Sequence, residues 1–182
     1  MTYYHVSSYI YENQCLTQKT KNCRCFCEYI SNCYARNYNE YKAYFDELKC
    51  YRLDEITGRD VSKWICEAIF DEVRKTMFLN YPSRIWGVYL IDSLEKACEF
   101  RKKYRDVNSA KIFEINVPEE DVFCFDMSIF TLANEEIRKT GFSFDSYNRA
   151  RKLAELYWSG KVIDGDKELL IDRPVIVGRR VA

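Results

Sequence analysis

The chain has 182 residues, of which 47% are hydrophobic and 31% charged, as in an ordinary globular domain. Lys plus Arg and Asp plus Glu number 28 each, so no net field draws the whole protein onto nucleic acid or an anionic membrane, although a local basic patch could still bind one. No apolar run approaches the roughly 20 residues of a membrane helix, and the N-terminus lacks the pattern of a secretory signal. We therefore expect a cytoplasmic protein without a membrane partner.

Nine cysteines are many for such a chain, and because nine is odd and no export signal accompanies them, we expect reduced thiols. The densest stretch alternates Cys23, Cys25 and Cys27, with Cys15 and Cys33 nearby. Alternate side chains of a strand lie about 6.7 Å apart, whereas sulfurs that share a tetrahedral zinc lie within about 4 Å of each other. We therefore expect no metal site.

Hydrophobic periodicity divides the chain into helices, with apolar residues every three or four positions, and short strands rich in β-branched and aromatic residues. The predicted elements in chain order are a strand over 2–6, helices over 28–50 and 60–78, a strand over 85–91, a helix from Asp92 or Ser93 to 104, strands over 110–117 and 122–125, a helix from Asp145 or Ser146 to 159, and strands over 168–171 and 175–179. The stretch after the first strand is expected to be irregular as far as residue 27.

Helices and strands in this order are segregated rather than regularly alternating, which predicts an α+β fold. Three prolines, six glycines and no visible linker predict a single domain over residues 1–182. No Gly-rich phosphate loop is present, so neither a P-loop nor a Rossmann site is supported. The aromatic residues of the two early helices lie on one stripe each and are expected to form core.

Three positions could carry chemistry. His5 lies near the end of the first strand and is the only histidine in the chain. Tyr89 lies in the strand that leads into a capped helix, and Glu168 opens a late apolar strand. Taken singly, each has an ordinary structural explanation: a satisfied histidine, a packed tyrosine and a solvated glutamate.

Taken together and in this order, the motifs around these positions resemble the histidine–tyrosine–acidic branch of the ADP-ribosyltransferase superfamily. Rifampin-modifying ADP-ribosyltransferases share the middle stretch best, and uncharacterised prokaryotic relatives share the motifs at 82–84 and 157–170. The resemblance covers nearly the whole chain apart from roughly residues 10 to 80. The matching segments are 3–7 (YYHVS), 82–84 (PSR), 88–97 (VYLIDSLEKA), 111–117 (KIFEINV), 122–126 (VFCFD), 157–160 (YWSG) and 168–170 (ELL).

The resemblance implies a split sheet with a helical segment, about 28–80, inserted after the first strand. This segment is longer than in compact members of the superfamily. The resemblance also implies cleavage of the nicotinamide–ribose bond of NAD and transfer of ADP-ribose to an acceptor, which could be a protein, a nucleic acid or a small molecule. Members of the superfamily occur as toxins, resistance enzymes and phage-conflict proteins, and the sequence does not choose among these settings.

The residues that match the motifs take the roles implied by the resemblance. Glu168 would be the catalytic acid, although Asp164, Asp166 and Asp172 lie close by in the sequence. It would stabilise the positive charge that develops on the ribose.

Four further residues would bind NAD. His5 would hydrogen-bond a ribose hydroxyl, and Tyr89 would stack on the nicotinamide. Ser83 and Arg84 would contact the dinucleotide, Arg84 through its phosphates. Because His5 orients the substrate rather than acting as a general base, a shallow pH dependence near neutrality is expected.

Two alternatives share this fold. A NAD glycohydrolase would use water as acceptor, and no sequence feature separates it from a transferase. A catalytically silent module would instead bind a protein partner through the helical segment.

Overall fold

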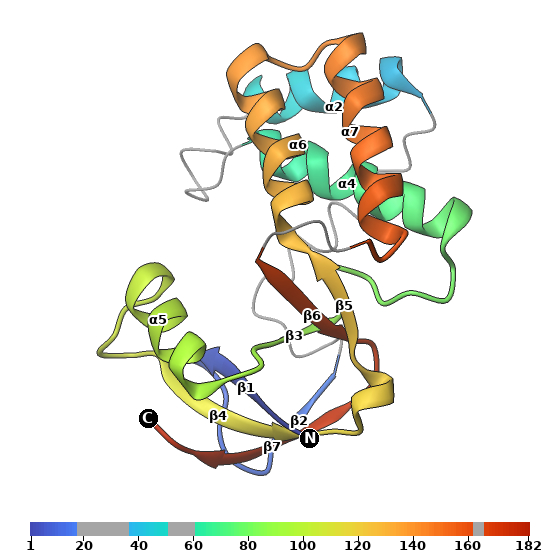
Figure 1. Ribbon diagram of the computed structural model, residues 1–182. Helices are drawn as coiled ribbons and strands as arrows, with labels where there is room; N and C mark the ends of the chain where they lie inside the picture. The colour runs from blue at the N-terminus through green and yellow to red at the C-terminus, as the bar shows by residue number, and fades with distance from the viewer. Residues whose placement is uncertain (18–36, 51–60, 162–165) are drawn as a thin grey trace. The chain divides into compact units, whose positions relative to one another are not determined.

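The computed structural model describes residues 1–17, 37–50, 61–161 and 166–182. These residues confirm the α+β class (Figure 1). The chain divides into two compact units. The β-sheet unit comprises Met1–Asn22, Trp86–Cys124 and Glu168–Ala182, and the helical unit comprises Cys23–Ile85 and Phe125–Lys167. Within the described ranges, no helix has the length and apolar character needed to cross a membrane.

The first sheet of the β-sheet unit has the strand order β1-β4-β7-β2 and is antiparallel at every pairing. Its strands are β1 (Thr2–Ser7), β2 (Cys15–Leu16), β4 (Lys111–Asn116) and β7 (Val175–Arg180). Three of them confirm predicted strands, whereas the short β2 lies in a stretch expected to be irregular, and that prediction was wrong there. The two residues of β2 pair with Val175 and Ile176, and Leu16 is buried in the apolar core.

The second sheet has the order β3-β6-β5 and consists of β3 (Val88–Leu90), β6 (Lys167–Ile171) and β5 (Phe123–Asp126). β3 is shorter than the predicted strand over 85–91, because the Ile85 N–H is bonded to the Ser83 hydroxyl rather than to a neighbouring strand. One bridge joins β1 to the end of β3: Tyr4 and Ile91 exchange backbone hydrogen bonds of 2.8 and 2.9 Å. Buried residues of both sheets, including Phe113 and Leu169, form one apolar core.

The helix α5 (Leu94–Tyr104) belongs to the same unit and lies beside β1 and β4 (Figure 1). The Ser93 hydroxyl caps it by accepting the Lys96 N–H at 3.2 Å, which confirms one of the two predicted caps. Ala97 is fully buried against residues of β1 and β4. Leu94, the first residue of the helix, is 39% exposed.

The helical unit consists of α2 (Tyr38–Cys50), α4 (Val61–Met77), α6 (Met127–Thr140) and α7 (Phe144–Trp158). The predicted stripes of α2 and α4 are buried where they are described, except at Tyr38, which is half-buried, and at Met77, which is exposed at the last turn. The helix α6 was not predicted. The cap of α7 is Ser143 rather than Asp145 or Ser146, and Ser146 completes a reciprocal capping box.

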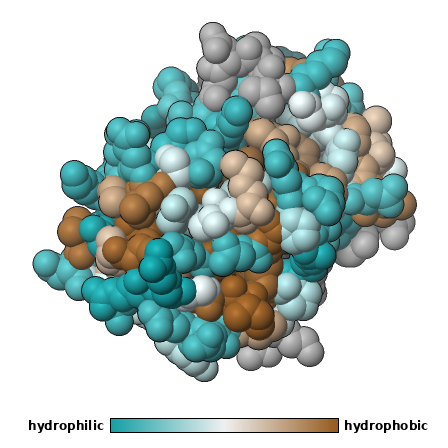
Figure 2. All heavy atoms as spheres, turned by 60° about the horizontal axis from the view of Figure 1, so that its bottom comes forward, coloured by the Kyte–Doolittle hydropathy of each residue, from teal (hydrophilic) through white to brown (hydrophobic). Residues whose placement is uncertain are grey.

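The surface of the molecule mixes polar and apolar residues. Figure 2 shows apolar residues gathered on the face it presents, bordered by hydrophilic ones. Exposed apolar side chains of the β-sheet unit include Ile176 and Val107. Exposed apolar residues are common on folded proteins, so these residues alone do not identify a binding surface.

Candidate functional site

His5 is held by the strand that carries Tyr89. The His5 Nδ1 atom lies 2.8 Å from the Tyr89 carbonyl oxygen. A carbonyl oxygen can only accept, so Nδ1 is the donor and carries the proton. In the neutral imidazole, Nε2 is then an acceptor with its lone pair in the ring plane.

This contact lies where β1 and β3 separate. The bridge between Tyr4 and Ile91 is isolated, and the next donor to β3 is the His5 side chain instead of a backbone N–H. The imidazole therefore continues the contact between the strands beyond the bridge. Its ring position is set by backbone geometry, which is a firmer support than a contact between two flexible side chains.

Tyr89 and Glu168 lie on neighbouring strands. Tyr89 is paired with Leu170, and Glu168 is two residues away from Leu170 along β6. Because successive residues of a strand point to opposite faces, Glu168 and Leu170 point the same way, and Tyr89, paired with Leu170, shares their face. Diagonal neighbours of this kind are about 7–8 Å apart, within reach of a tyrosine and a glutamate side chain.

Burial distinguishes Glu168 from the acidic residues around it. Glu168 is 7% exposed, whereas Asp166 and Asp172, at the two ends of β6, are exposed. Asp164 lies outside the described residues. Only a carboxylate shielded from water acts strongly on a nearby developing charge, so among the described acids of this segment Glu168 has the most suitable surroundings.

Arg84 and Ser83 lie in the helical unit and have extensive contacts there. Arg84 is 3% exposed, and its guanidinium donates to both carboxylate oxygens of Glu67 at 3.0 and 3.2 Å. The same group lies 3.9 Å from the centre of the Phe130 ring and 3.2 Å from the Tyr157 hydroxyl. These contacts give Arg84 a structural role within the helical unit.

Ser83 has similar surroundings. It is 5% exposed, its hydroxyl donates to the Asp71 carboxylate at 3.3 Å, and its oxygen accepts the Ile85 N–H at 3.2 Å. Asp71 also pairs with Arg74 and Lys75. The segment before β3 is therefore fixed to α4 by buried polar contacts.

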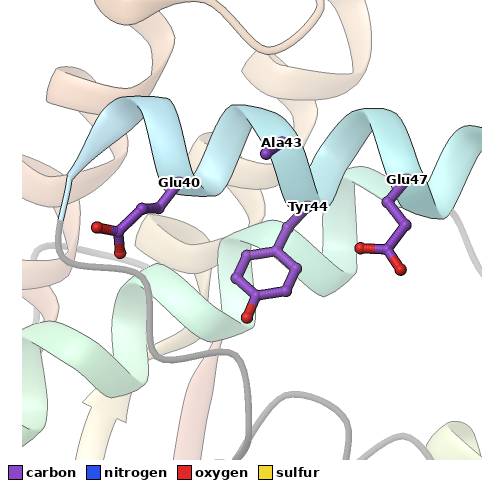
Figure 3. A pocket seen from close by; sticks show the side chains of 4 residues that line it. All are labelled: Glu40, Ala43, Tyr44 and Glu47. Atoms are coloured by element: carbon purple, nitrogen blue, oxygen red, sulfur yellow. The ribbon is translucent and has the colours of Figure 1, made fainter.

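A surface hollow of about 340 Å³ lies on α2. Glu40, Ala43, Tyr44 and Glu47 line it and project from one side of the helix (Figure 3). These residues belong to the helical unit, whereas His5, Tyr89 and Glu168 belong to the β-sheet unit. The hollow therefore lies on a different unit from these three residues.

The described cysteines are free thiols, and Cys66 is the buried one among them. Among the described residues, no group of three or more His, Cys, Asp or Glu could hold a metal ion, and Cys23, Cys25, Cys27 and Cys33 lie outside them. Cys66 is a free thiol, and complete burial raises its pKa. A buried, protonated thiol is a poor nucleophile.

Sequence reasoning missed the acidic partners in α4. Glu67 and Asp71 are 5% and 4% exposed, and they neutralise Arg84, Arg74 and Lys75. A signal was present, because Glu67 lies between the buried Trp64 and Ala68 and thus on the inward side of the helix. A carboxylate at such a position requires a buried cation.

Comparison with known proteins gives a family but no characterised relative. No curated protein is significantly similar to this chain. The model of one family, described as "Protein of unknown function (DUF2441)", matches residues 3–181. This match includes β1, β3 and β6, the strands of His5, Tyr89 and Glu168. Because it spans almost the whole sequence, the chain belongs to the DUF2441 family.

Proposed function

We propose that this protein is an ADP-ribosyltransferase that cleaves the nicotinamide–ribose bond of NAD and transfers ADP-ribose to an acceptor. The observation that carries the proposal is the hydrogen bond of 2.8 Å between His5 Nδ1 and the Tyr89 carbonyl. It joins two of the three motif residues, although 84 positions separate them in the sequence.

The position of Glu168, the third of these residues, also supports the proposal. β6, which carries Glu168, pairs with β3 in a register that puts Glu168 and Tyr89 on one face. All three residues belong to the β-sheet unit. The two sheets, joined at β1 and β3 by a single bridge, fit the split sheet that the resemblance implies.

In the proposed reaction, the bond between the ribose C1′ and the nicotinamide nitrogen breaks, and the electron pair leaves with nicotinamide. The ribose becomes oxocarbenium-like, and an acceptor nucleophile then bonds to C1′ and loses its proton. The Glu168 carboxylate stabilises the developing positive charge and accepts a hydrogen bond from a ribose hydroxyl. Electrostatic stabilisation of this kind contributes about 2.7–4 kcal/mol in other enzymes.

His5 and Tyr89 hold the substrate in the reactive pose. Since Nδ1 donates to the Tyr89 carbonyl, Nε2 of the neutral ring is the acceptor that would receive a hydrogen bond from a ribose hydroxyl. If the ring becomes protonated, Nε2 donates to the same hydroxyl oxygen instead, which accounts for the expected shallow pH dependence. The half-buried Tyr89 ring stacks on nicotinamide, a contact of about 0.5–1.5 kcal/mol.

The test is release of nicotinamide from NAD by the purified protein, with cell lysate added as a source of acceptors. We expect Glu168→Gln to lower the rate by about 100- to 1,000-fold. Asp166→Asn and Asp172→Asn are matched controls, because they remove carboxylates at the two ends of the same strand. Each control should retain the wild-type rate.

A second pair of variants separates the two nitrogen atoms of His5. His5→Asn keeps an N–H donor near Nδ1 for the Tyr89 carbonyl but lacks Nε2, whereas His5→Ala lacks both. We expect both variants to lose activity by about 5- to 150-fold, the value of one hydrogen bond to a buried polar group. Only His5→Ala should also lower the free energy of unfolding.

The outcomes discriminate between the functions. Label from NAD incorporated into lysate components indicates a transferase, and release without labelling indicates a NAD glycohydrolase. If no nicotinamide is released under any condition by folded protein, the catalytic proposal is wrong and a partner-binding module takes its place.

A further inference from the structure

The last turn of α5 carries an unusual concentration of positive charge. Arg101, Lys102 and Lys103 are followed by Tyr104 and Arg105, so four of five consecutive residues are cationic. All of them except Arg101 are exposed, and Tyr104 is 55% exposed. The chain as a whole has no net charge, so this cluster is a local departure from the average.

Two aromatic rings lie within this basic cluster. The centroids of Phe100 and Tyr104 are 5.1 Å apart, with the rings inclined at 46°. The Lys103 Nζ lies 5.0 Å from the Tyr104 centroid, and the Arg105 guanidinium carbon lies 5.4 Å from that of Phe100. Cations thus lie beside two rings on one short stretch of the helix, of which the Tyr104 ring is exposed and the Phe100 ring packs partly against the core.

Helix stability alone does not account for this composition. Cations in a last turn interact favourably with the helix dipole, but the benefit is modest and falls off within that turn. Arg101 and Arg105 are four residues apart, a spacing at which like charges destabilise a helix. Acidic residues flank the cluster at Glu99 and Asp106, whereas Asp92 lies before the start of the helix and pairs with Lys96 at 2.8 Å.

We propose that this basic–aromatic end of α5, residues 100–105, binds single-stranded nucleic acid. The cations match the regularly spaced phosphates of a polynucleotide, which release bound counterions when lysine or arginine contacts them. Tyr104 offers a ring on which an unpaired base can stack, and bases inside a duplex are unavailable for such stacking. The observations on α5 do not depend on His5 or Glu168, so this inference stands apart from the proposed enzyme activity.

The test is fluorescence anisotropy with labelled 20-nucleotide oligo(U) and oligo(dT), and with a duplex of equal length, across a series of salt concentrations. We expect both single strands to bind. Lys102→Ala with Lys103→Ala removes two phosphate contacts, which should reduce the slope of log K against log salt by about 1.4. Alanine favours helix, and far-UV circular dichroism verifies that α5 is retained.

A matched control uses the basic last turn of α6. Arg138→Ala with Lys139→Ala removes the same charge from the end of α6, and we expect wild-type binding. Tyr104→Ala should weaken binding about 5- to 10-fold, whereas Tyr104→Phe should retain it, because the ring provides the stacking.

Three results would overturn the inference. One is equal loss of binding in the α5 and α6 variants, which would indicate a response to net charge alone. Another is duplex binding as tight as that of the single strands, with no effect of Tyr104→Ala. The third is the absence of oligonucleotide binding together with α5-dependent binding to vesicles containing phosphatidylserine, which would assign the surface to an anionic membrane.

Discussion

The two units use polar residues in opposite ways. In the helical unit, Arg84 and Glu67 are both almost fully buried and neutralise each other. In the β-sheet unit, His5 and Tyr89 are half-buried, and the imidazole is held by a backbone carbonyl. A charged group enclosed by its partners supports the fold, whereas a polar group with one anchored side and some remaining exposure can still meet a ligand. Residue type alone therefore does not separate the two roles.

The largest effect on the free energy of unfolding is expected at Arg84. Arg84→Ala leaves the Glu67 carboxylate buried without its cation, and we expect the free energy of unfolding to fall by about 3–5 kcal/mol. Urea denaturation measures this change. Replacing both partners, as Arg84→Met with Glu67→Leu, should restore most of the stability. A stable Arg84→Ala variant with a raised KM for NAD would instead favour the phosphate role implied by the family resemblance.

A smaller effect on the free energy of unfolding is expected in the β-sheet unit, where the backbones of β4 and β7 lie in close contact. A Cβ atom at Gly178 would lie 2.8 Å from the Glu114 carbonyl oxygen and 3.3 Å from the Glu114 Cβ. Since β4 and β7 cannot separate without losing hydrogen bonds, Gly178→Ala should lower the free energy of unfolding by about 1–3 kcal/mol. Ile176→Thr, on the same strand but exposed, should change it by less than about 0.5 kcal/mol. Equal effects of the two variants would show that the close approach is unimportant.

The smallest effect expected is a pH dependence of stability caused by Glu72 in the helical unit. Burial raises the pKa of Glu72 in α4, although Arg151 lies 3.6 Å away and opposes the shift. A carboxyl group whose pKa is raised by folding contributes stability below its unfolded pKa and loses that contribution as pH rises through the folded pKa. Between pH 4 and 7, the wild type should therefore lose stability relative to Glu72→Gln. Urea midpoints measured across this range test the sign, and a relative gain by the wild type would contradict it.

Local patterns were sufficient for most of the fold. The apolar residues of α4 and β4 that the sequence pattern picks out are buried in the structure, because hydrophobic periodicity arises from the side of an element that faces the core. The helix α6 was missed although it has four inward residues at helical spacing, since β5 runs into it directly with no turn residue between them. Asp126 ends the strand and caps the helix, and its carboxylate accepts the Ser128 N–H at 2.9 Å.

The candidate site could be predicted only in part. The pattern identified Glu168 as the head of an apolar strand, but the contrast in burial with Asp166 and Asp172 required the tertiary structure. The bond from His5 to the Tyr89 carbonyl depends on the place where β1 and β3 separate, which no local spacing encodes. The same holds for Arg84 and Glu67, whose pairing across 17 residues depends on how the chain returns after α4.

The pairing of β1 with β4 also affects the order in which the molecule can form. Thr2 lies opposite Asn116, and 114 positions separate them in the sequence. At about 5–20 residues per second, a ribosome takes about 6–23 s to make the intervening chain. During that interval β1 has no β4 to pair with, and unpaired strand edges are the places where nascent chains associate wrongly. We therefore expect a chaperone to bind β1 during synthesis, before β4 has been made.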